Sequence, residues 1–354
     1  MKPIEDYISE IEKADWEASE AARTAQNTLT KPPGSLGKLE ELSIRLAGMT
    51  GISRPSLGTK VVFTMAADHG VTTEGVSAYP SEVTRQMVLN FATGGAAINV
   101  LARHVGAEVR VVDMGVASDE SWPSCVVNRK VAAGTRNMAK DRAMTVEEAR
   151  SCLEIGAELA TQAVQNGAGA IAVGDMGIGN TTAASAITSV ITGRTPAEVT
   201  GRGTGIDDSR LKLKISAIEK AIETNSPDAS DGIDTLSKVG GFEIGGMAGV
   251  LLGAASSRVP VFLDGFVSSS AGLIAATICP LSVDFMIASH LSAEPGHKYI
   301  LEHLRLVPLL DLNMRLGEGT GAALAFSVAE AACKIVAEMA TFDSAGVSGV
   351  RGED

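Results

Sequence analysis

The sequence predicts a layered α/β fold, in which a parallel sheet is flanked by helices. Four short runs rich in β-branched residues are each followed by a stretch with helical spacing, and this alternation is typical of parallel strands joined by crossover helices. The composition agrees, because hydrophobic residues make up 45% of the chain, aromatic residues only 4%, and glycines number 38. Such an interior is built by close approach of small side chains, which favours helices layered on a sheet. The expected strands are residues 60–65, 109–114, 170–173 and 259–263.

Length and net charge limit the possible classes of function. A chain of 354 residues can hold one large and one small domain, at about 100 to 200 residues each. The formal net charge of −12 argues against a broad surface for nucleic acid or anionic membranes, although a local pocket can still bind phosphate. Any phosphate is therefore expected to be held mainly by backbone amides.

The chain shows no signal for export or membrane insertion. Its first residues lack the apolar core of a signal peptide, and its four cysteines are far apart, as expected for reduced thiols. The longest uncharged run, residues 265–283, is interrupted by serines, Gly272 and Pro280, which make it too polar and broken for a membrane helix. We expect a cytoplasmic protein with no membrane or nucleic-acid partner.

The N-terminal part is expected to be helical with a rigid break. Residues 4–29 carry apolar residues at helical spacing and predict one helix or two, and a further helix is expected at 36–49. Between them, Pro32-Pro33 and two glycines interrupt the pattern. This break is either a simple turn or a fixed polar rim on a substrate cleft.

Each expected strand is followed by a carboxylate and a glycine. In open α/β sheets ligands bind beyond the carboxyl ends of the strands, so we expect these ends to converge on one crevice. The best loop candidate elsewhere, residues 225–232, is too short to mark a domain boundary. The four strand-end carboxylates are Asp68, Asp113, Asp175 and Asp264.

Two glycine-rich turns are candidates for binding an anion. Residues 174–182 follow a strand and open a helix at 183–191, whose first N–H groups are unpaired and can bind phosphate. This turn lacks the Lys-Ser/Thr pair of a P-loop, so ATP use has weak support. Residues 201–209 repeat the arrangement before a helix at 210–222. The alternatives are a tight turn without a ligand for the first and a capped helix start for the second.

The stretch 315–325 places one carboxylate, Glu318, among three glycines directly before a helix expected at 321–339. Burial raises the pKa of a carboxyl group, whereas the N–H donors at a helix start lower it. A partly buried glutamate is a better proton acceptor near neutral pH than a solvated one. Glu318 is therefore a candidate general base, and the alternative is a glutamate that only complements the helix dipole.

Residues 289–298 hold two of the five histidines beside a carboxylate. With Asp68 and His69 they suggest a metal site, but no H-E-x-x-H or comparable ligand spacing is present. Hydrogen-bonding loop anchors are the favoured interpretation. No G-x-S-x-G motif supports a serine hydrolase.

Residues 74–87 combine an aromatic side chain, a proline and polar groups, and a helix is expected to follow through Asn99. The segment either walls the pocket of a flat ligand or is a loop with a helix cap. The sequence favours neither alternative.

A set of motifs spread in order over residues 30–345 resembles the nicotinate-nucleotide–dimethylbenzimidazole phosphoribosyltransferase family. No large insertion separates them, and composition alone could not produce the match. The motifs are residues 30–37, 67–71, 75–77 with 82–84, 174–182, 201–205, 240–244, 263–266, 289–290 and 315–319.

The resemblance implies an enzyme of cobalamin lower-ligand assembly. Nicotinate mononucleotide would give its phosphoribosyl group to 5,6-dimethylbenzimidazole, releasing nicotinate and forming α-ribazole 5′-phosphate with inversion at the anomeric carbon. It also implies a homodimer, a Rossmann-like large domain at 59–311, and a small helical domain made from residues 1–58 with 312–354. No metal or redox cofactor is expected.

The resemblance also assigns roles to residues. Glu318 matches the general base, and Asp175 matches a second acidic position, where some relatives carry glutamate. Asp175 is expected to support the oxocarbenium-like ribose or to bind a ribose hydroxyl. Phosphate and ribose are assigned to Gly177, Gly179, Asn180, Thr181, Gly203, Gly205 and Ser292, and the substrate base to Tyr79, Gln86 and Leu316, with Gly317 and Gly319 beside the catalytic glutamate.

Three other functions stay open. The same chemistry could use another acceptor, such as adenine. The glycine turns could belong to a non-catalytic nucleotide-binding module. A metal-dependent hydrolase would use Asp68, His69, His290 and His297.

Overall fold

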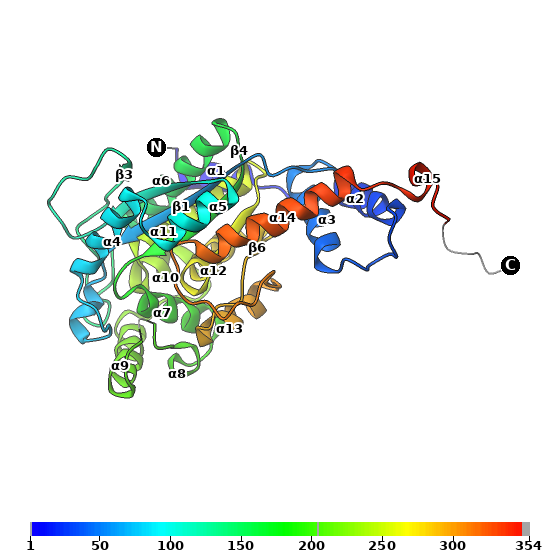
Figure 1. Cartoon of the computed structure of the whole chain (residues 1–354). Coiled ribbons are helices and arrows are strands. Elements are labelled where there is room, and N and C mark those ends of the chain that lie inside the picture. Colours follow the sequence, from blue (N-terminus) through cyan, green and yellow to red (C-terminus); the bar gives the residue numbers. More distant parts are fainter. Residues whose placement is uncertain (1, 204, 349–354) are drawn as a thin grey trace.

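The computed structural model describes residues 2–203 and 205–348 (Figure 1). Thr204 of the second glycine-rich turn and residues 349–354 of the expected small domain lie outside the described residues. Within the described residues the strands are β1 (Thr59–Ala67), β2 (Ala107–Gly115), β3 (Val126–Asn128), β4 (Ala168–Met176), β5 (Val261–Leu263) and β6 (Met286–Ala288). They form one parallel sheet in the order β3-β2-β1-β4-β5-β6.

The sheet confirms the parallel α/β fold that the sequence predicts. β1 lies between β2 and β4, so that Val62 is opposite both Val109 and Ala172. Every residue of β1 after Thr59 is buried, as expected for a strand covered on both faces, and most of these residues are apolar. Sequence analysis missed β3 and β6, which have three residues each and lie at the two edges of the sheet.

The strand order reverses between β1 and β4. From β1 the chain proceeds outward through β2 to β3, and from β4 it proceeds outward through β5 to β6 in the opposite direction. In doubly wound sheets a ligand binds beyond the carboxyl ends of the strands at such a switch point. The turns that follow β1 and β4 are therefore where a site is expected.

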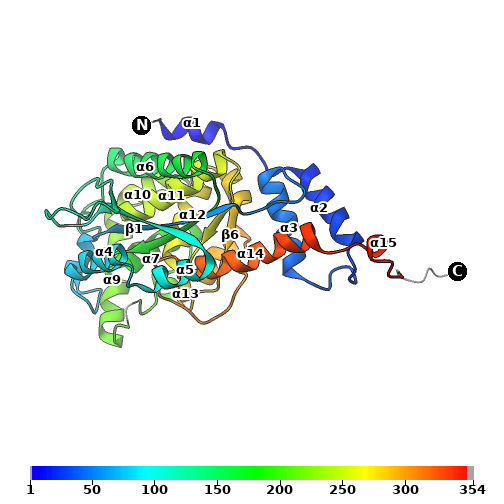
Figure 2. The ribbon, with the colours of Figure 1, turned by 45° about the horizontal axis from the view of Figure 1, so that its top comes forward.

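Helices cover both faces of the sheet (Figure 2). Within the described residues they are α1 (Ile4–Ser9), α2 (Trp16–Thr28), α3 (Lys38–Thr50), η1 (Gly70–Glu74), α4 (Glu82–Thr93), α5 (Ala97–Val105), α6 (Val146–Gln165), α7 (Asn180–Thr192), α8 (Pro196–Val199), α9 (Asp208–Asn225), α10 (Gly232–Val239), α11 (Phe242–Ser256), α12 (Phe266–Ile278), η2 (Pro280–Phe285), α13 (Pro295–Leu304), α14 (Thr320–Glu338) and α15 (Phe342–Ala345). One face packs on α11, which in turn packs on α6. The other face packs on α5 and α14.

The helices α6 and α11 approach each other closely because glycines lie at their contact. A Cβ atom added to Gly156 of α6 would overlap the backbone of α11, and one added to Gly249 of α11 would overlap the backbone of α6. Gly253 makes a similar approach to Ala157. The interior thus uses small residues to bring elements together, as the composition predicts.

The sequence predicts the helices of residues 4–29 correctly and those of residues 82–105 incorrectly. Residues 4–29 form two helices, and Asp15 caps the second by accepting the N–H group of Ala18. The expectation of one helix through Asn99 is wrong. Gly94 takes a left-handed conformation with φ +81°, which ends α4, and α5 begins at Ala97.

The Pro32-Pro33 break is a turn held by its own side chains. Glu40 accepts the N–H groups of Gly34 and Leu36 and pairs with Lys31, whose Nζ lies 2.8 Å from Glu40 Oε1. Neither Lys31 nor Glu40 borders the cavity at the carboxyl ends of the strands. Of the two alternatives for this break, the turn is therefore the better supported.

The two ends of the chain meet beside the sheet. α2 and α3 pack on each other and on α14, and Leu29 forms an isolated β-bridge with Thr341. α1 lies apart from them and packs on α6 and α11 (Figure 2). We propose the division into residues 1–58 with 312–354 and residues 59–311, with α1 attached to the larger part.

In the described part of the chain, α14 is the one helix whose length and hydropathy would allow it to cross a membrane. Of its most apolar stretch, 56% is buried inside the protein. Its neighbours are α3, α5 and β4. These contacts are those of a core helix.

Candidate active site

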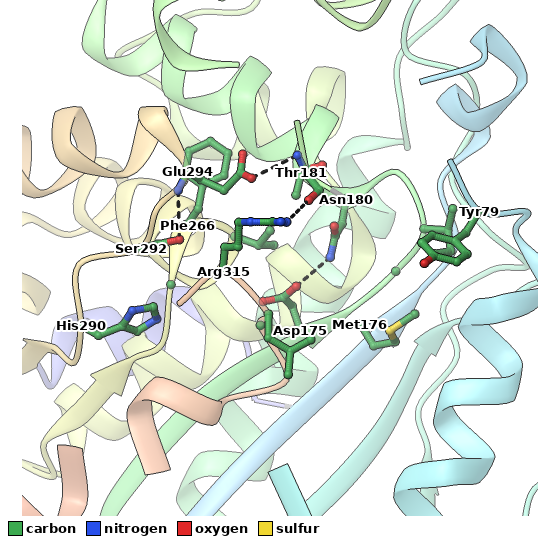
Figure 3. A pocket seen from close by; sticks show the side chains of 17 residues that line it. Tyr79, Asp175, Met176, Asn180, Thr181, Phe266, His290, Ser292, Glu294 and Arg315 are labelled. Carbon is green, nitrogen blue, oxygen red and sulfur yellow. Dashed lines mark hydrogen bonds between the residues drawn. The ribbon is translucent and has the colours of Figure 1, made fainter. Parts of the chain in front are cut away.

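A cavity of about 310 Å³ lies beyond the carboxyl ends of β4, β5 and β6 (Figure 3). Its walls come from the turn after β4, the start of α7, the segment after β6 and the segment before α14. Tyr79, from the loop that follows β1 and η1, stands at its rim. The lining residues are Tyr79, Asp175, Met176, Gly177, Ile178, Asn180, Thr181, Gly203, Gly265, Phe266, Val267, His290, Ser292, Glu294, Arg315, Leu316 and Gly317.

One end of the cavity is suited to an anion. The N-terminus of α7 is found here, with Gly179 as its cap and the hydroxyl of Thr181 in the wall. Lys214 of α9 donates from Nζ to Thr181 Oγ1 at 2.8 Å and to the carbonyl oxygen of Gly201 at 3.3 Å. Burial lowers the pKa of Lys214 to about 8, against the opposing effect of the Glu294 carboxylate.

Arg315 and Glu294 complete this end of the cavity (Figure 3). Arg315 Nη1 donates to the carbonyl oxygen of Gly203 at 2.9 Å, and the N–H group of Gly203 donates to Glu294 Oε1 at 3.1 Å. Glu294 Oε2 is buried and has no hydrogen-bond partner among the described residues. Arg315 lines the cavity itself, whereas Lys214 lies behind the hydroxyl of Thr181, to which it donates. A phosphate bound at the start of α7 would add a negative charge close to the Lys214 cation.

The middle of the cavity presents Asp175, which stands near the end of β4. It is 7% exposed, and Asn180 Nδ2 donates to its Oδ2 at 2.8 Å. Burial raises the pKa of Asp175 well above its ordinary value, and the carboxylates of Asp264 and Glu243 raise it further. The hydrogen bond from Asn180 opposes this shift without cancelling it. A carboxyl group in this state can donate a hydrogen bond as well as accept one.

Glu318 lies directly behind the wall formed by Leu316 and Gly317, and its side chain does not line the cavity. It is 4% exposed, and its Oε2 accepts the N–H group of Ile98 at the start of α5, at 3.1 Å. Its Oε1 forms no hydrogen bond with the described residues. The pKa of Glu318 is raised, mainly by burial and also by the Asp264 carboxylate. The hydrogen bond from the Ile98 N–H group opposes this shift without cancelling it. This direction suits a general base.

The segment after β6 and the start of α13 carry two buried histidines, of which His290 lines the cavity. His297 Nδ1 accepts the N–H group of Ser292 at 2.9 Å, and its Nε2 lies 2.9 Å from Ser269 Oγ. Burial, and to a smaller extent the neighbouring His290, lower the pKa of His297 to about 3. His290 lines the cavity with its buried Nδ1 unpartnered among the described residues.

The histidines expected for a metal-dependent hydrolase are not brought together as ligands. His69 Nε2 lies 2.7 Å from Glu243 Oε1 in a buried pair, His290 lines the cavity, and His297 is buried on α13. Among residues 2–203 and 205–348, no three side chains of His, Cys, Asp or Glu are grouped as metal ligands would be. The hydrogen-bonding anchors expected from the sequence describe these histidines better.

The other end of the cavity is apolar and open. Tyr79 and Leu316, which are 54% and 58% exposed, form its rim with Met176. Gln86, assigned with them to the base, instead lines a separate cavity together with Asp68. The structure therefore gathers two of the three expected base-binding side chains.

The other predicted positions fall into two groups. Gly177, Asn180, Thr181, Gly203, Ser292 and Gly317 line the cavity. Gly179 and Gly319 lie behind its wall as the caps of α7 and α14, and Gly205, with φ +94°, does not reach it.

The expected convergence of all four strand-end carboxylates is wrong for two of them. Asp175 lines the cavity and Asp264 lies just behind it, but Asp68 borders the other cavity. Asp113 is used by its own loop, where it accepts the N–H group of Gly115 at 3.0 Å and the Nε1–H of Trp122 at 2.7 Å. A short carboxylate at a strand end often binds the turn that follows it, and sequence cannot distinguish this use from catalysis.

Two residues that line this end of the cavity, Arg315 and Glu294, and Lys214 behind it were not assigned from the sequence. Lys214 resembles its exposed neighbour Lys212 in every local respect, so no sequence signal marks it. Arg315 and Glu294 lie within residues 315–325 and 289–298, which the sequence analysis had marked as candidates. Their closeness in sequence to Glu318 and to the histidines could have indicated them.

Comparisons with known proteins agree with one another. Residues 11–347 match a family model described as phosphoribosyltransferase. Over 348 residues the chain is 58% identical to the nicotinate-nucleotide–dimethylbenzimidazole phosphoribosyltransferase of Chloroflexus aurantiacus, covering 98% of this chain and 99% of that protein. The protein of the same name from Roseiflexus castenholzii is 56% identical over 349 residues, with 99% of each chain covered. The crystal structure of the Thermus thermophilus protein of that name superposes with a TM-score of 0.90 at 46% identity, covering 96% of this chain and 100% of that one.

Proposed function

The chain belongs to the nicotinate-nucleotide–dimethylbenzimidazole phosphoribosyltransferase family, and on this premise we propose how its cavity carries out the reaction. The enzyme moves the 5-phosphoribosyl group from nicotinate mononucleotide to 5,6-dimethylbenzimidazole, and the products are α-ribazole 5′-phosphate and nicotinate. The observation that carries the assignment of roles is an anion-binding end next to two buried carboxyl groups of raised pKa.

The phosphate of nicotinate mononucleotide is assigned to the end of the cavity at the start of α7, where Lys214 lies behind Thr181. The N–H groups at the start of α7, the hydroxyls of Thr181 and Ser292, and the cations of Lys214 and Arg315 support this placement. The ribose then lies beside Asp175, and the open end with Tyr79 and Leu316 is left to the acceptor base. Donor binding is thereby separated from the groups proposed for proton transfer.

Glu318 is the proposed general base. As one nitrogen of the benzimidazole attacks the anomeric carbon, the bond to nicotinate breaks and its electron pair returns to the pyridine nitrogen. The acceptor ring becomes cationic, so its other N–H becomes acidic and can pass its proton to Glu318. The Ile98 N–H group occupies Oε2, which leaves Oε1 to approach the acceptor beside Gly317.

Asp175 is proposed to bind a ribose hydroxyl. The alternative role is electrostatic support of the oxocarbenium-like ribose. A carboxyl group whose pKa is raised well above its ordinary value is a weak source of negative charge but a competent hydrogen-bonding group. The hydrogen-bonding role is therefore favoured.

The test is an assay of product mass with nicotinate mononucleotide and equal amounts of dimethylbenzimidazole and adenine. Wild-type protein, with EDTA present, is expected to form mainly α-ribazole 5′-phosphate. Glu318→Gln is expected to lose about 10²- to 10⁴-fold in kcat, the usual contribution of a general base, while calorimetry shows nicotinate mononucleotide still binding. Retention of wild-type kcat by this variant would mean that another group takes the proton.

Two controls accompany this assay. Glu302→Gln removes an exposed glutamate charge on α13 and is expected to keep the wild-type rate. Asp175→Asn keeps a hydrogen-bonding side chain of the same shape, so it is expected to keep far more activity than Glu318→Gln. An equal loss in both variants would favour the electrostatic role for Asp175.

The proposed assembly is a homodimer located in the cytoplasm, with small molecules as its only other partners. The support is the family resemblance together with the low cysteine content and the acidic net charge of −12. Light scattering of the purified protein tests the first part, since a homodimer requires twice the chain mass of 36.4 kDa.

A further inference from the structure

The Glu318 turn is the one buried place in the described chain where a residue other than glycine has a positive φ angle. Its φ is +65°, and a glycine with positive φ stands on each side of it. This conformation is unfavourable for a residue with a side chain and persists only where its surroundings fix it. The other non-glycine residues of this kind lie at exposed or half-buried positions, namely Ser226, Arg258, Arg305 and Asn313.

Asp264, which follows β5, holds the far side of this turn. Its Oδ2 accepts the N–H group of Gly319 at 3.1 Å. Its Oδ1 accepts the N–H groups of Gly321 at 2.7 Å and Ala322 at 3.1 Å. These are groups at the start of α14 that have no partner within the helix, and the cap residue Gly319 has no side chain to bind them. A carboxylate from a distant strand therefore caps the helix.

The near side of the turn is held by neutral groups. Thr64 of β1 donates from its hydroxyl to the carbonyl oxygen of Glu318 at 2.8 Å, and the N–H group of Glu318 donates to the carbonyl oxygen of Asp175 at 3.2 Å. The second of these bonds joins the backbones of the two carboxyl residues directly. A Cβ atom added to Gly174 would overlap this turn, so β4 also presses on it. The turn is thus enclosed by β1, β4 and the end of β5.

We propose that Asp264 is a positioning residue for the reaction: by binding the start of α14 it holds Glu318 in its left-handed conformation and so aims the carboxylate of the base. The inference rests on the proposed role of Glu318. Asp264 is fully buried and does not line the cavity, so it acts through Glu318 and does not touch the substrate.

The charge of Asp264 distinguishes this role from that of an ordinary helix cap. The carboxylate of Asp264 raises the pKa of Glu318 and that of Asp175, which makes Glu318 a stronger base. The other titratable side chain facing Asp264 is His290, whose Nε2 lies 3.7 Å from Asp264 Oδ1. Thr64 of β1 and the start of α5 face the turn with a hydroxyl and a backbone N–H group only. Loss of the Asp264 charge therefore lowers the pKa of the base.

The first test compares Asp264→Asn with wild type in the full chain. We expect kcat to fall by about 10- to 100-fold, as for a small misplacement of a catalytic group, while KM for nicotinate mononucleotide stays within about threefold. The acid limb of the kcat profile moves to lower pH, because Glu318 without its charged neighbour releases its proton more readily. An unchanged kcat, or a fall in kcat with an unmoved acid limb, overturns the proposal.

Asp231→Asn is the matched control. Asp231 also caps a helix, since its Oδ1 accepts the N–H groups of Ile233 and Asp234 at the start of α10, and it is exposed and does not line the cavity. This variant is expected to keep the wild-type kcat and the wild-type acid limb. The comparison separates a general effect of altering a helix cap from an effect on the Glu318 turn.

A double-mutant cycle separates failure of this inference from failure of the proposed function. If Asp264 acts through the base, Asp264→Asn lowers kcat little further when Glu318 is already glutamine. Additive losses overturn the positioning role and leave the base assignment intact. If the Glu318→Gln single variant keeps the wild-type kcat, the proposed role of Glu318 as general base is itself wrong. Should Asp264→Asn not fold, Asp264→Ser takes its place in the same cycle, because its hydroxyl can still accept one N–H group.

Discussion

Lys214 is a buried lysine with only neutral hydrogen-bond partners, the Thr181 hydroxyl and the Gly201 carbonyl oxygen. Its pKa falls to about 8 because burial disfavours the charged form. Burial destabilises the charged form of this lysine, and an anionic ligand nearby would stabilise it again. We therefore expect a phosphate bound at the start of α7 to stabilise the charged form of Lys214.

Lys214→Met is expected to weaken binding of nicotinate mononucleotide by about 10- to 100-fold, the usual effect of losing a hydrogen bond to a charged group. In the wild-type free enzyme the lysine is charged below its pKa of about 8 and neutral above it. Affinity of the wild type should therefore fall by about tenfold from pH 7 to pH 9, whereas the variant should show no such fall. Calorimetry at the two pH values measures both effects. Lys212→Met, an exposed lysine of the same helix, is the control and should behave as wild type.

The residues of the site were predicted unevenly from the sequence, and the reason is physical. Glu318 and Asp175 stand in glycine-rich motifs, where close backbone approach leaves a pattern in the sequence. Lys214 works through burial, which depends on the packing of α9 onto α7 and leaves no local pattern. Gln86 lies in the predicted segment but lines another cavity, because side-chain direction on α4 depends on tertiary contacts.

At the scale of elements, glycine determines how close two helices can lie. α6 and α11 make the most extensive contact between helices in the described chain, and Gly156 of α6 lies against the backbone of α11. This approach places α11 on β1, β2 and β4, and Asp175 near the end of β4 lines the cavity. The composition predicted close packing of this kind, but which two helices pack on each other could be seen only in the structure.

Gly156→Ala is expected to destabilise the fold by about 1 to 3 kcal/mol, the usual cost of overpacking, because the new methyl group overlaps the Gly246 carbonyl oxygen of α11. Denaturant unfolding followed by circular dichroism measures the loss. Gln162→Ala, an exposed change on α6, should stay within about 0.5 kcal/mol of wild type. Equal stability of Gly156→Ala and wild type would show that the two helices can separate without cost.

At the scale of the whole molecule, the alternation of strand and helix predicted the parallel sheet, and the motif order along the chain predicted the family. The elements that sequence missed, β3 and β6, are edge strands of three residues whose pairing depends on neighbours far away in the chain. The position of α1 on α6 and α11 was also not predicted, because an amphipathic helix does not reveal which surface it covers. The sequence thus predicts elements and motifs, whereas the tertiary fold determines which of the strand-end carboxylates lie at the same cavity.

The stability of the whole fold is expected to depend on pH through His297. Its ring is buried in the neutral form, because Nδ1 accepts the Ser292 N–H group, and its pKa of about 3 lies below the ordinary value of 6.5 that the unfolded chain regains. The unfolded chain therefore takes up a proton first, and stability decreases as the pH falls below about 6.5 toward 3. Between pH 7 and pH 5 this one residue should account for a loss of about 2 kcal/mol in the free energy of unfolding. In guanidinium titrations at the two pH values, the free energy of unfolding of His297→Gln should change less with pH than that of wild type, by this amount. His303→Gln, an exposed change on the same helix, should show the pH dependence of wild type. A His297→Gln variant with the full pH dependence of wild type would contradict the assignment of a buried neutral imidazole.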